Sequence, residues 1–253
     1  MDFPLPDHDH RKILLSQYDY LEGPKSRSSE FMFTIRVFLQ FIKGFRKLHF
    51  VGPCVTVFGS ARFKPGHKYY QMAEQVGRCI VKTGFTVMTG GGPGIMEAAN
   101  KGAYESGGIS VGCNIRLPEE QQPNAYMHHW VTLDYFFVRK FLLLKYSYAF
   151  VVLPGGWGTM DEMFETLTLV QTGMIHNFPV VLMGTDYYTP LMEYLDLMLQ
   201  HGTISAKDLS YVALTDDPHI AIEHLEKYVT GNYTVRKRKG FWILGEQLRR
   251  RYS

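Results

Sequence analysis

The feature that most constrains the fold lies in residues 149–172, where an apolar run passes through a glycine-rich turn into a helical pattern. The run Ala149-Phe150-Val151-Val152-Leu153 is typical of a strand buried on both faces of a parallel sheet. Residues 160–172 repeat apolar side chains at helical spacing, which predicts a helix. The glycines between them let the backbone approach a ligand, and the positive end of the helix favours an anion. This stretch predicts a phosphate seat between a strand and a helix.

Two polar side chains belong to the same stretch. Thr159 is expected to cap the helix or to donate its hydroxyl to a ligand. Glu162 is expected within the first helical turn, where a carboxylate stabilises the helix dipole but repels a phosphate. Its position therefore suggests a chemical task, although a lone glutamate at a helix start more often serves the helix alone.

The alternation of strand and helix patterns extends over most of the chain. The expected strands cover residues 54–60, 85–88, 109–115, 130–133, 149–153, 179–183 and 211–214. The expected helices cover residues 69–83, 95–105, 135–148, 160–172, 188–200 and 218–229. Strands and helices that alternate at short spacing predict an α/β fold with a parallel sheet covered on both faces.

Three parts are expected along the chain: an extension over residues 1–50, a single domain over residues 51–230 and a basic tail over residues 231–253. The extension contains an amphipathic helical pattern at residues 31–47. Such a helix can lie on a membrane surface, but packing on the main domain or on a second subunit is commoner. The tail carries basic clusters at residues 236–239 and 249–251.

The composition excludes several classes of protein. No apolar run reaches membrane-spanning length, and the acidic N-terminus lacks a signal-peptide pattern. The three cysteines are far apart and form no metal-binding or redox pair, which favours reduced thiols and a cytoplasmic location. The ten histidines show no zinc-binding spacing. We therefore expect neither a metal nor a cofactor, and no contact with a membrane.

A second glycine-rich turn, Gly90 to Gly94, follows the strand expected at residues 85–88 and precedes a helix. Ligands of open α/β sheets bind at the carboxyl ends of strands, where such turns gather. Neither turn has the spacing of a dinucleotide-binding fingerprint, and neither is followed by the Lys-Ser or Lys-Thr of a P-loop. Two turns that both open helices favour another kind of phosphorylated ligand.

Three motifs together resemble the LONELY GUY (LOG) family of phosphoribohydrolases, which was long labelled lysine decarboxylases. They are GGGPGIMEAA at residues 90–99, Arg139-Lys140, and PGGxGTxxE at residues 154–162, and the resemblance covers roughly residues 53–229. It implies a Rossmann-like doubly wound sheet, a homodimer or larger homo-oligomer, and no metal. It also implies hydrolysis of the N-glycosidic bond of a nucleoside 5′-monophosphate, such as AMP or an N6-modified cytokinin nucleotide, to the free base and ribose 5-phosphate.

The resemblance also assigns roles to individual residues. Arg139 and Glu162 would be the catalytic pair. The substrate-binding residues would be Ser60, Gly91, Gly92, Glu120, Lys140, Gly155, Gly156, Trp157, Gly158, Thr159 and Thr168. The chain departs from the short members of the family in the residues before Arg139, at Glu97, and in its terminal extensions, which are similar to those of the longer members. These departures leave the preferred base open.

Three other functions were weighed against hydrolysis. A nucleotide sensor without catalysis would share the fold, but Arg139 and Glu162 are intact. A nucleic-acid-binding protein would act through the basic tail, yet the net charge is only +3. Lysine decarboxylation requires a pyridoxal-binding lysine site, and the sequence contains none that we can identify. A nucleoside monophosphate is therefore the expected ligand.

Overall fold

The computed structural model describes residue 21 and residues 23–117 and 122–229. The basic tail, the first 20 residues of the N-terminal extension and Glu120 lie outside these residues. The three-part division of the chain therefore stays a prediction.

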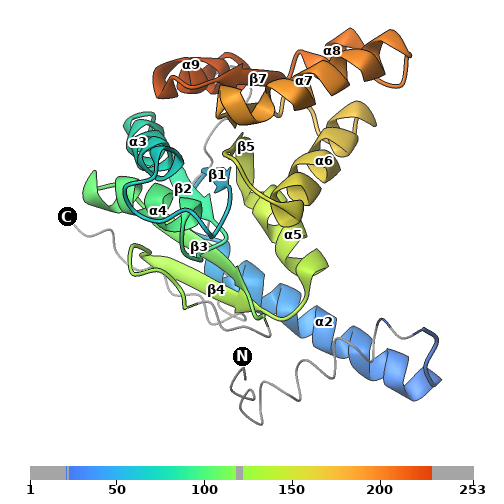
Figure 1. Ribbon diagram of the computed structural model, residues 1–253. Coiled ribbons are helices and arrows are strands. Elements are labelled where there is room, and N and C mark those ends of the chain that lie inside the picture. The colour runs from blue at the N-terminus through green and yellow to red at the C-terminus, as the bar shows by residue number, and fades with distance from the viewer. Residues whose placement is uncertain (1–20, 22, 118–121, 230–253) are drawn as a thin grey trace, which may run out of the picture.

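The core of the molecule is one parallel sheet of seven strands (Figure 1) in the order β4-β3-β2-β1-β5-β6-β7. Every pair of neighbouring strands runs parallel. The expected doubly wound α/β fold is confirmed. The strands are β1 (Cys54–Phe58), β2 (Thr86–Thr89), β3 (Ser110–Ile115), β4 (His129–Leu133), β5 (Ser147–Val152), β6 (Val180–Met183) and β7 (Val212–Thr215).

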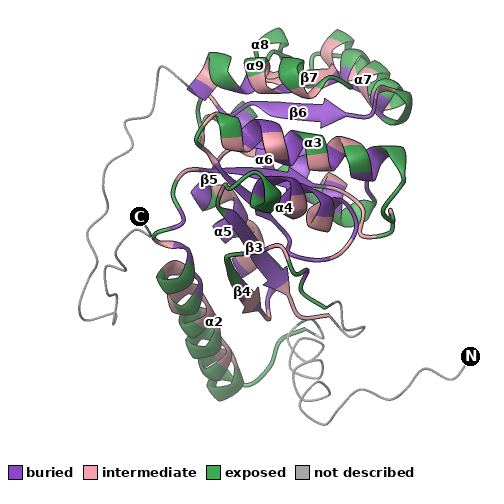
Figure 2. Cartoon of the chain, turned by 90° about the vertical axis from the view of Figure 1, so that its left-hand side faces the viewer, coloured by how far each residue is buried: buried purple, intermediate pink, exposed green. Residues whose placement is uncertain are grey.

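Helices cover both faces of the sheet, and each face has its own apolar core. One face carries α3 (Lys68–Lys82), α4 (Ile95–Glu105) and α9 (Pro218–Val229). The other carries α2 (Arg27–Leu48), α5 (Phe136–Tyr146), α6 (Trp157–Gln171) and α7 (Thr185–Gln200). Figure 2 shows the buried residues concentrated in the strands and on the inner sides of the helices. Because both faces are covered, β1, β2 and β6 are buried along their whole length.

Helix α2 packs against the domain. It begins at Arg27, earlier than expected, because the Ser26 side chain caps it by accepting a hydrogen bond from the amide of Ser29. Phe33, Val37 and Phe41 pack against the core formed with β4 and α5. The expectation that this helix packs on the main domain is confirmed. No helix in the described part of the chain is long and apolar enough to cross a membrane.

Helix α6 begins earlier than its apolar pattern predicted. It starts at Trp157 with Gly156 as its N-cap, so the expectation that Thr159 caps this helix is wrong. Glu162 consequently lies in the second turn and not in the first. Gly156 is extended and precedes the first helical residue directly, without a capping side chain. A helix start lacking a capping side chain gives little sequence signal.

Three smaller boundaries also differ from the predictions. Helix α5 ends at Tyr146, because Ser147 is extended and its hydroxyl closes the helix by donating to the carbonyl of Leu143 at 2.6 Å. Helix α7 begins at Thr185 instead of residue 188. A short helix, α8 (Ala206–Leu209), was not predicted; it is held by a capping box between Ser205 and Asp208.

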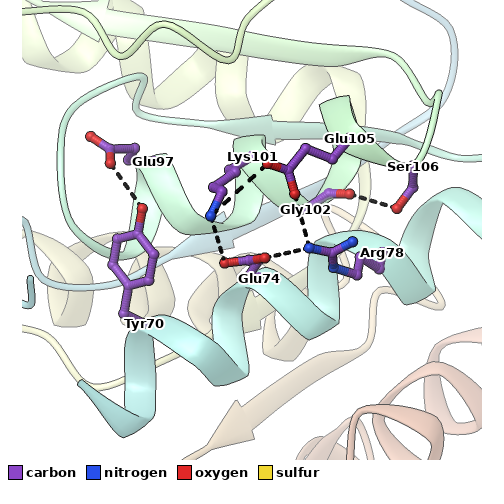
Figure 3. Close-up of polar contacts among 8 residues, drawn as sticks. All are labelled: Tyr70, Glu74, Arg78, Glu97, Lys101, Gly102, Glu105 and Ser106. Carbon is purple, nitrogen blue, oxygen red and sulfur yellow. Dashed lines mark hydrogen bonds and ion pairs between the residues drawn. The ribbon is translucent and has the colours of Figure 1, made fainter. Parts of the chain in front are cut away.

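A network of charged side chains connects α3 with α4 (Figure 3). The guanidinium of Arg78 lies 2.9 Å from a carboxylate oxygen of Glu105, and the ammonium of Lys101 lies 3.3 Å from Glu74. Nearer the start of both helices, the Tyr70 hydroxyl donates to Glu97 at 2.8 Å. These contacts join α3 to α4 along the length of α4, and the bond from Tyr70 to Glu97 lies in its first turn, next to the glycine-rich turn that precedes it.

Candidate active site

The candidate site lies where the winding of the sheet reverses, beyond the carboxyl ends of β1, β2 and β5. Strand β1 has β2 on one side and β5 on the other, which makes its end a topological switch point. The amide of Ser60, just after β1, donates to the carbonyl of Pro154 at 2.9 Å. The carbonyl of Ser60 accepts from the amide of Ile95 at 3.0 Å. Ser60 thus joins the two glycine-rich turns, which sequence reasoning had expected to meet.

The turn after β2 requires glycine at position 91 and is held by hydrogen bonds to its backbone. Gly91 has φ +73°, and a Cβ there would lie 1.6 Å from Oδ1 of Asn114. Its amide donates to the Thr89 hydroxyl at 2.9 Å, and its carbonyl accepts from the Asn124 amide at 3.0 Å. The side chain of Asn124 donates to the carbonyl of Gly92 at 3.0 Å. Gly91 and Gly92 are both buried, so this turn is rigid.

Sequence reasoning missed the buried asparagines behind this turn. Asn100 is fully buried on α4, where it accepts from the Thr89 hydroxyl at 2.6 Å and donates to the Ser110 hydroxyl at 2.7 Å. It also accepts from the Asn124 side chain at 3.0 Å. An asparagine on the apolar face of a helix was the available signal, because a buried amide is retained only where it is hydrogen-bonded. Oδ1 of Asn114 is buried with no partner among the described residues.

Arg139 reaches three elements from α5. Its Nε donates to the carbonyl of Cys113 at the end of β3, at 2.9 Å. Its Nη2 lies against Gly90, where an added Cβ would be 2.3 Å away. Its Nη1 lies 3.6 Å from Oε1 of Glu162. The side chain is 13% exposed, so the guanidinium is held in place and still reachable.

Glu162 is the buried acid of the site. The residue is 5% exposed, and burial raises the pKa of its carboxyl group from 4.5 to about 7, although Arg139 and Lys140 act in the opposite direction. A carboxyl group in this environment gains and loses a proton near neutral pH. Such a group beside an arginine, at a switch point, is a candidate catalytic group. The structure therefore brings the two predicted catalytic residues together.

Lys140 points toward α6. Its ammonium lies 2.7 Å from Glu165 and 3.1 Å from Asp161. Burial lowers the pKa of Lys140, but the two carboxylates outweigh it and the pKa is raised. In this arrangement Lys140 is held by α6 and adds positive charge near Glu162.

The remaining predicted residues differ in where they lie. Gly155 and Thr159 are buried together, while Gly156, Trp157 and Gly158 face outward, and Trp157 is 93% exposed. Thr168 is exposed and donates to the carbonyl of Phe164 at 2.8 Å. Six residues beyond Glu162, it lies about 9 Å further along the helix axis. The structure therefore does not bring Thr168 to the turn in this chain.

The arrangement combines three chemical capacities. The first amides of α6 lack intrahelical acceptors and can bind an anion. Glu162 can hold or release a proton, and Arg139 can contact phosphate or sugar oxygens. Among the described residues, no group of three His, Cys, Asp or Glu side chains could hold a metal ion.

Comparisons with known proteins show the family of the chain. A family model described as "Possible lysine decarboxylase" matches residues 96–225. The chain is similar to the cytokinin riboside 5′-monophosphate phosphoribohydrolase of Rhodococcoides fascians, with 37% identity over 176 residues, covering 66% of this chain and 86% of the relative. It is 30% identical over 180 residues to a probable enzyme of the same name from Oryza sativa subsp. japonica, covering 69% and 72%.

Solved structures show the same fold. The Moco carrier protein of Chlamydomonas reinhardtii matches 71% of this chain and 98% of its own, with a TM-score of 0.53 and 25% identity. The molybdenum cofactor binding protein of Rippkaea orientalis matches 70% and 96%, with a TM-score of 0.53 and 21% identity.

Proposed function

The chain belongs to the family whose model is described as possible lysine decarboxylase and whose similar relatives are named cytokinin riboside 5′-monophosphate phosphoribohydrolases; from this premise we propose that it hydrolyses the N-glycosidic bond of a nucleoside 5′-monophosphate. The products are a free base and ribose 5-phosphate. The substrate class is a purine nucleotide, AMP or an N6-modified AMP.

One observation carries the proposal: a buried carboxyl group with a pKa near 7 lies 3.6 Å from an arginine, next to the glycine-rich turn that opens α6. Cleavage of an N-glycosidic bond passes through an oxocarbenium-like state, as glycoside hydrolysis does. The Glu162 carboxylate stabilises the positive ribose and accepts a proton from the attacking water; the hydroxyl bonds to C1′ as the C–N bond breaks, and the proton passes to the departing base. A general base is most effective when its pKa is close to the working pH.

Arg139 and the turn complete the proposed mechanism. Arg139 holds phosphate or sugar oxygens and stabilises charge as the base departs. The amides at the start of α6 bind the phosphate, and this remote binding energy positions the ribose against Glu162. In this proposal Ser60, whose backbone connects the two glycine-rich turns, and Gly91 and Gly92 complete the substrate site. The sensor hypothesis has no comparable observation in its favour, because a sensor gains nothing from an acid kept near neutral pKa beside its ligand.

The test is to incubate the protein with AMP, an N6-substituted AMP and adenosine, with and without EDTA, and to separate the products by chromatography. We expect free base and ribose 5-phosphate from the monophosphates, no effect of EDTA, and far slower cleavage of adenosine. Release of inorganic phosphate, or of a nucleoside, would refute the proposed reaction.

We also propose that the protein acts as a homodimer or larger homo-oligomer. Helix α2 presents Phe38 and Leu39, which are 58% and 57% exposed, and α5 presents Phe141, which is 48% exposed. Large apolar side chains grouped on neighbouring helices are the usual material of subunit interfaces. Light scattering that gives the mass of a single chain would contradict this assembly.

The proposed location is the cytoplasm. All three cysteines are buried free thiols, as is usual in a reducing compartment. The proposed catalytic unit is residues 51–230, with the extension and the tail as additions to it.

A further inference from the structure

Three consecutive carbonyls at the turn before α6 accept hydrogen bonds from donors outside the turn. The carbonyl of Leu153 accepts from the hydroxyl of Tyr188 at 2.9 Å. The carbonyl of Pro154 accepts from the amide of Ser60 at 2.9 Å. The carbonyl of Gly155 accepts from the hydroxyl of Tyr187 at 2.9 Å. Two of the three donors are therefore adjacent tyrosines in the first turn of α7.

The start of α7 is itself fixed. The amides of Gly184 and Thr185 donate to the same oxygen of Asp216 at 2.9 and 2.7 Å. The two tyrosine rings pack edge to face, with centroids 5.0 Å apart. Tyr188 is 1% exposed and belongs to the core, whereas Tyr187 is 46% exposed. The hydroxyl of Tyr187 is thus carried by a rigid element, although its ring is not needed to fill the core.

A carbonyl held in place also fixes the amide on the other side of the same planar peptide. The carbonyl of Gly155 shares its peptide with the N–H of Gly156, and the two groups point in opposite directions. A peptide between two glycines has little steric resistance to rotation about its flanking bonds. Without the Tyr187 hydroxyl, this peptide can turn its carbonyl toward the phosphate seat, where an oxygen repels an anion.

We propose that Tyr187 is a positioning residue for the phosphate seat: its hydroxyl holds the Gly155–Gly156 peptide with its N–H toward the phosphate of the nucleotide. The inference rests on the proposed function, since it assumes that the seat binds a phosphate ester. It assigns to α7 a part in substrate binding that no sequence motif indicated.

The test is Tyr187→Phe in the full chain, with Tyr194→Phe as the matched control. Tyr194 lies on the same helix, is 57% exposed and is remote from the turn. Binding of ribose 5-phosphate should weaken about three- to tenfold in Tyr187→Phe, the range expected for one hydrogen bond. The kcat/KM for AMP should fall by the same factor and the unfolding temperature by no more than about 2–4 °C, the cost of one internal hydrogen bond, whereas adenosine binding should stay at its wild-type value. Tyr194→Phe should change none of these quantities.

Two results would overturn the role of Tyr187: unchanged binding of ribose 5-phosphate, or an equal loss for ribose 5-phosphate and adenosine. The second result would indicate a general disturbance of the site. If the wild-type protein binds ribose 5-phosphate but cleaves no nucleotide, the proposed function fails, and the binding comparison still decides the role of Tyr187. A wild-type protein that cleaves AMP but does not bind ribose 5-phosphate would overturn the role of Tyr187 and leave the proposed reaction standing.

Discussion

Replacing Glu162 by glutamine separates the catalytic role of this residue from its effect on stability. The glutamine keeps the size of the side chain and removes the charge. A positioned acid or base typically contributes about 10²–10⁴-fold to a rate, so kcat should fall by about this factor. In the wild-type protein, kcat/KM should rise as the pH passes through about 7, because the reaction needs the ionised carboxylate. The variant should lack this rise.

The same substitution should stabilise the fold at alkaline pH. The pKa of Glu162 rises from 4.5 to about 7 in the folded protein, which corresponds to about 3 kcal/mol at ~1.4 kcal/mol per pKa unit. Between these two pH values the folded state holds a proton that the unfolded state has lost. The free energy of unfolding therefore decreases as the pH rises through this window, and the full cost is present above about pH 7.

The glutamine variant lacks this destabilisation, because its side chain is uncharged like the protonated form of Glu162. Both forms lack the ion pair to Arg139, so the loss of that pair is already included in the comparison. It should be more stable than the wild type by about 3 kcal/mol at pH 8 and by less than about 1 kcal/mol at pH 5. Urea unfolding at both pH values measures the difference. Glu223→Gln, at an exposed position on α9, is the control. Glu165 is unsuitable because it pairs with Lys140. A variant with near wild-type turnover, or with the same stability difference at both pH values, would refute this reasoning.

Two further predictions follow from the contacts of the site. Arg139→Lys should lower kcat/KM for AMP by about tenfold or more in steady-state assays, because one ammonium cannot reach Cys113, Gly90 and Glu162 together; wild-type kinetics would contradict this. Asn100→Ala should lower the free energy of unfolding by at least about 2 kcal/mol in urea titrations, because it leaves several buried donors and acceptors unpaired; an unchanged midpoint would show that this network is dispensable.

The sheet and its order of elements could be predicted because the signals are local. The apolar run at residues 149–153 predicted a strand, because a strand covered on both faces is expected to be apolar throughout. In the structure these residues lie within β5 or directly after it. The glycine-rich turns are recognisable from their composition, and the rule for open α/β sheets places both at the carboxyl ends of the strands. Neither inference needs knowledge of distant contacts.

The contacts of the site could not be predicted in the same way, because they depend on the order of the strands. Arg139 meets Glu162 only because the connection through α5 crosses from β4, at the edge of the sheet, to β5, beside β1. The pairing of Tyr187 with Gly155 likewise depends on where α7 starts, and the sequence pattern placed that start too late. Asn100 gave a usable signal, but its partners come from three other segments.

The corrected start of α6 resolves a conflict that the sequence posed. A carboxylate in the first turn would face the bound phosphate directly, whereas the second turn places Glu162 about 7 Å along the helix axis from Trp157. The amides of Trp157 and Gly158 are then available to bind the phosphate, and Arg139 lies beside the carboxylate and offsets its repulsion from the anion. The nearby positive charges do not fully offset the burial of Glu162. Burial keeps the pKa of Glu162 near neutrality, so the charged form destabilises the fold. Such a residue lowers the stability of the fold and so has no structural role, whereas hydrolysis through a positively charged ribose requires a carboxylate at this position.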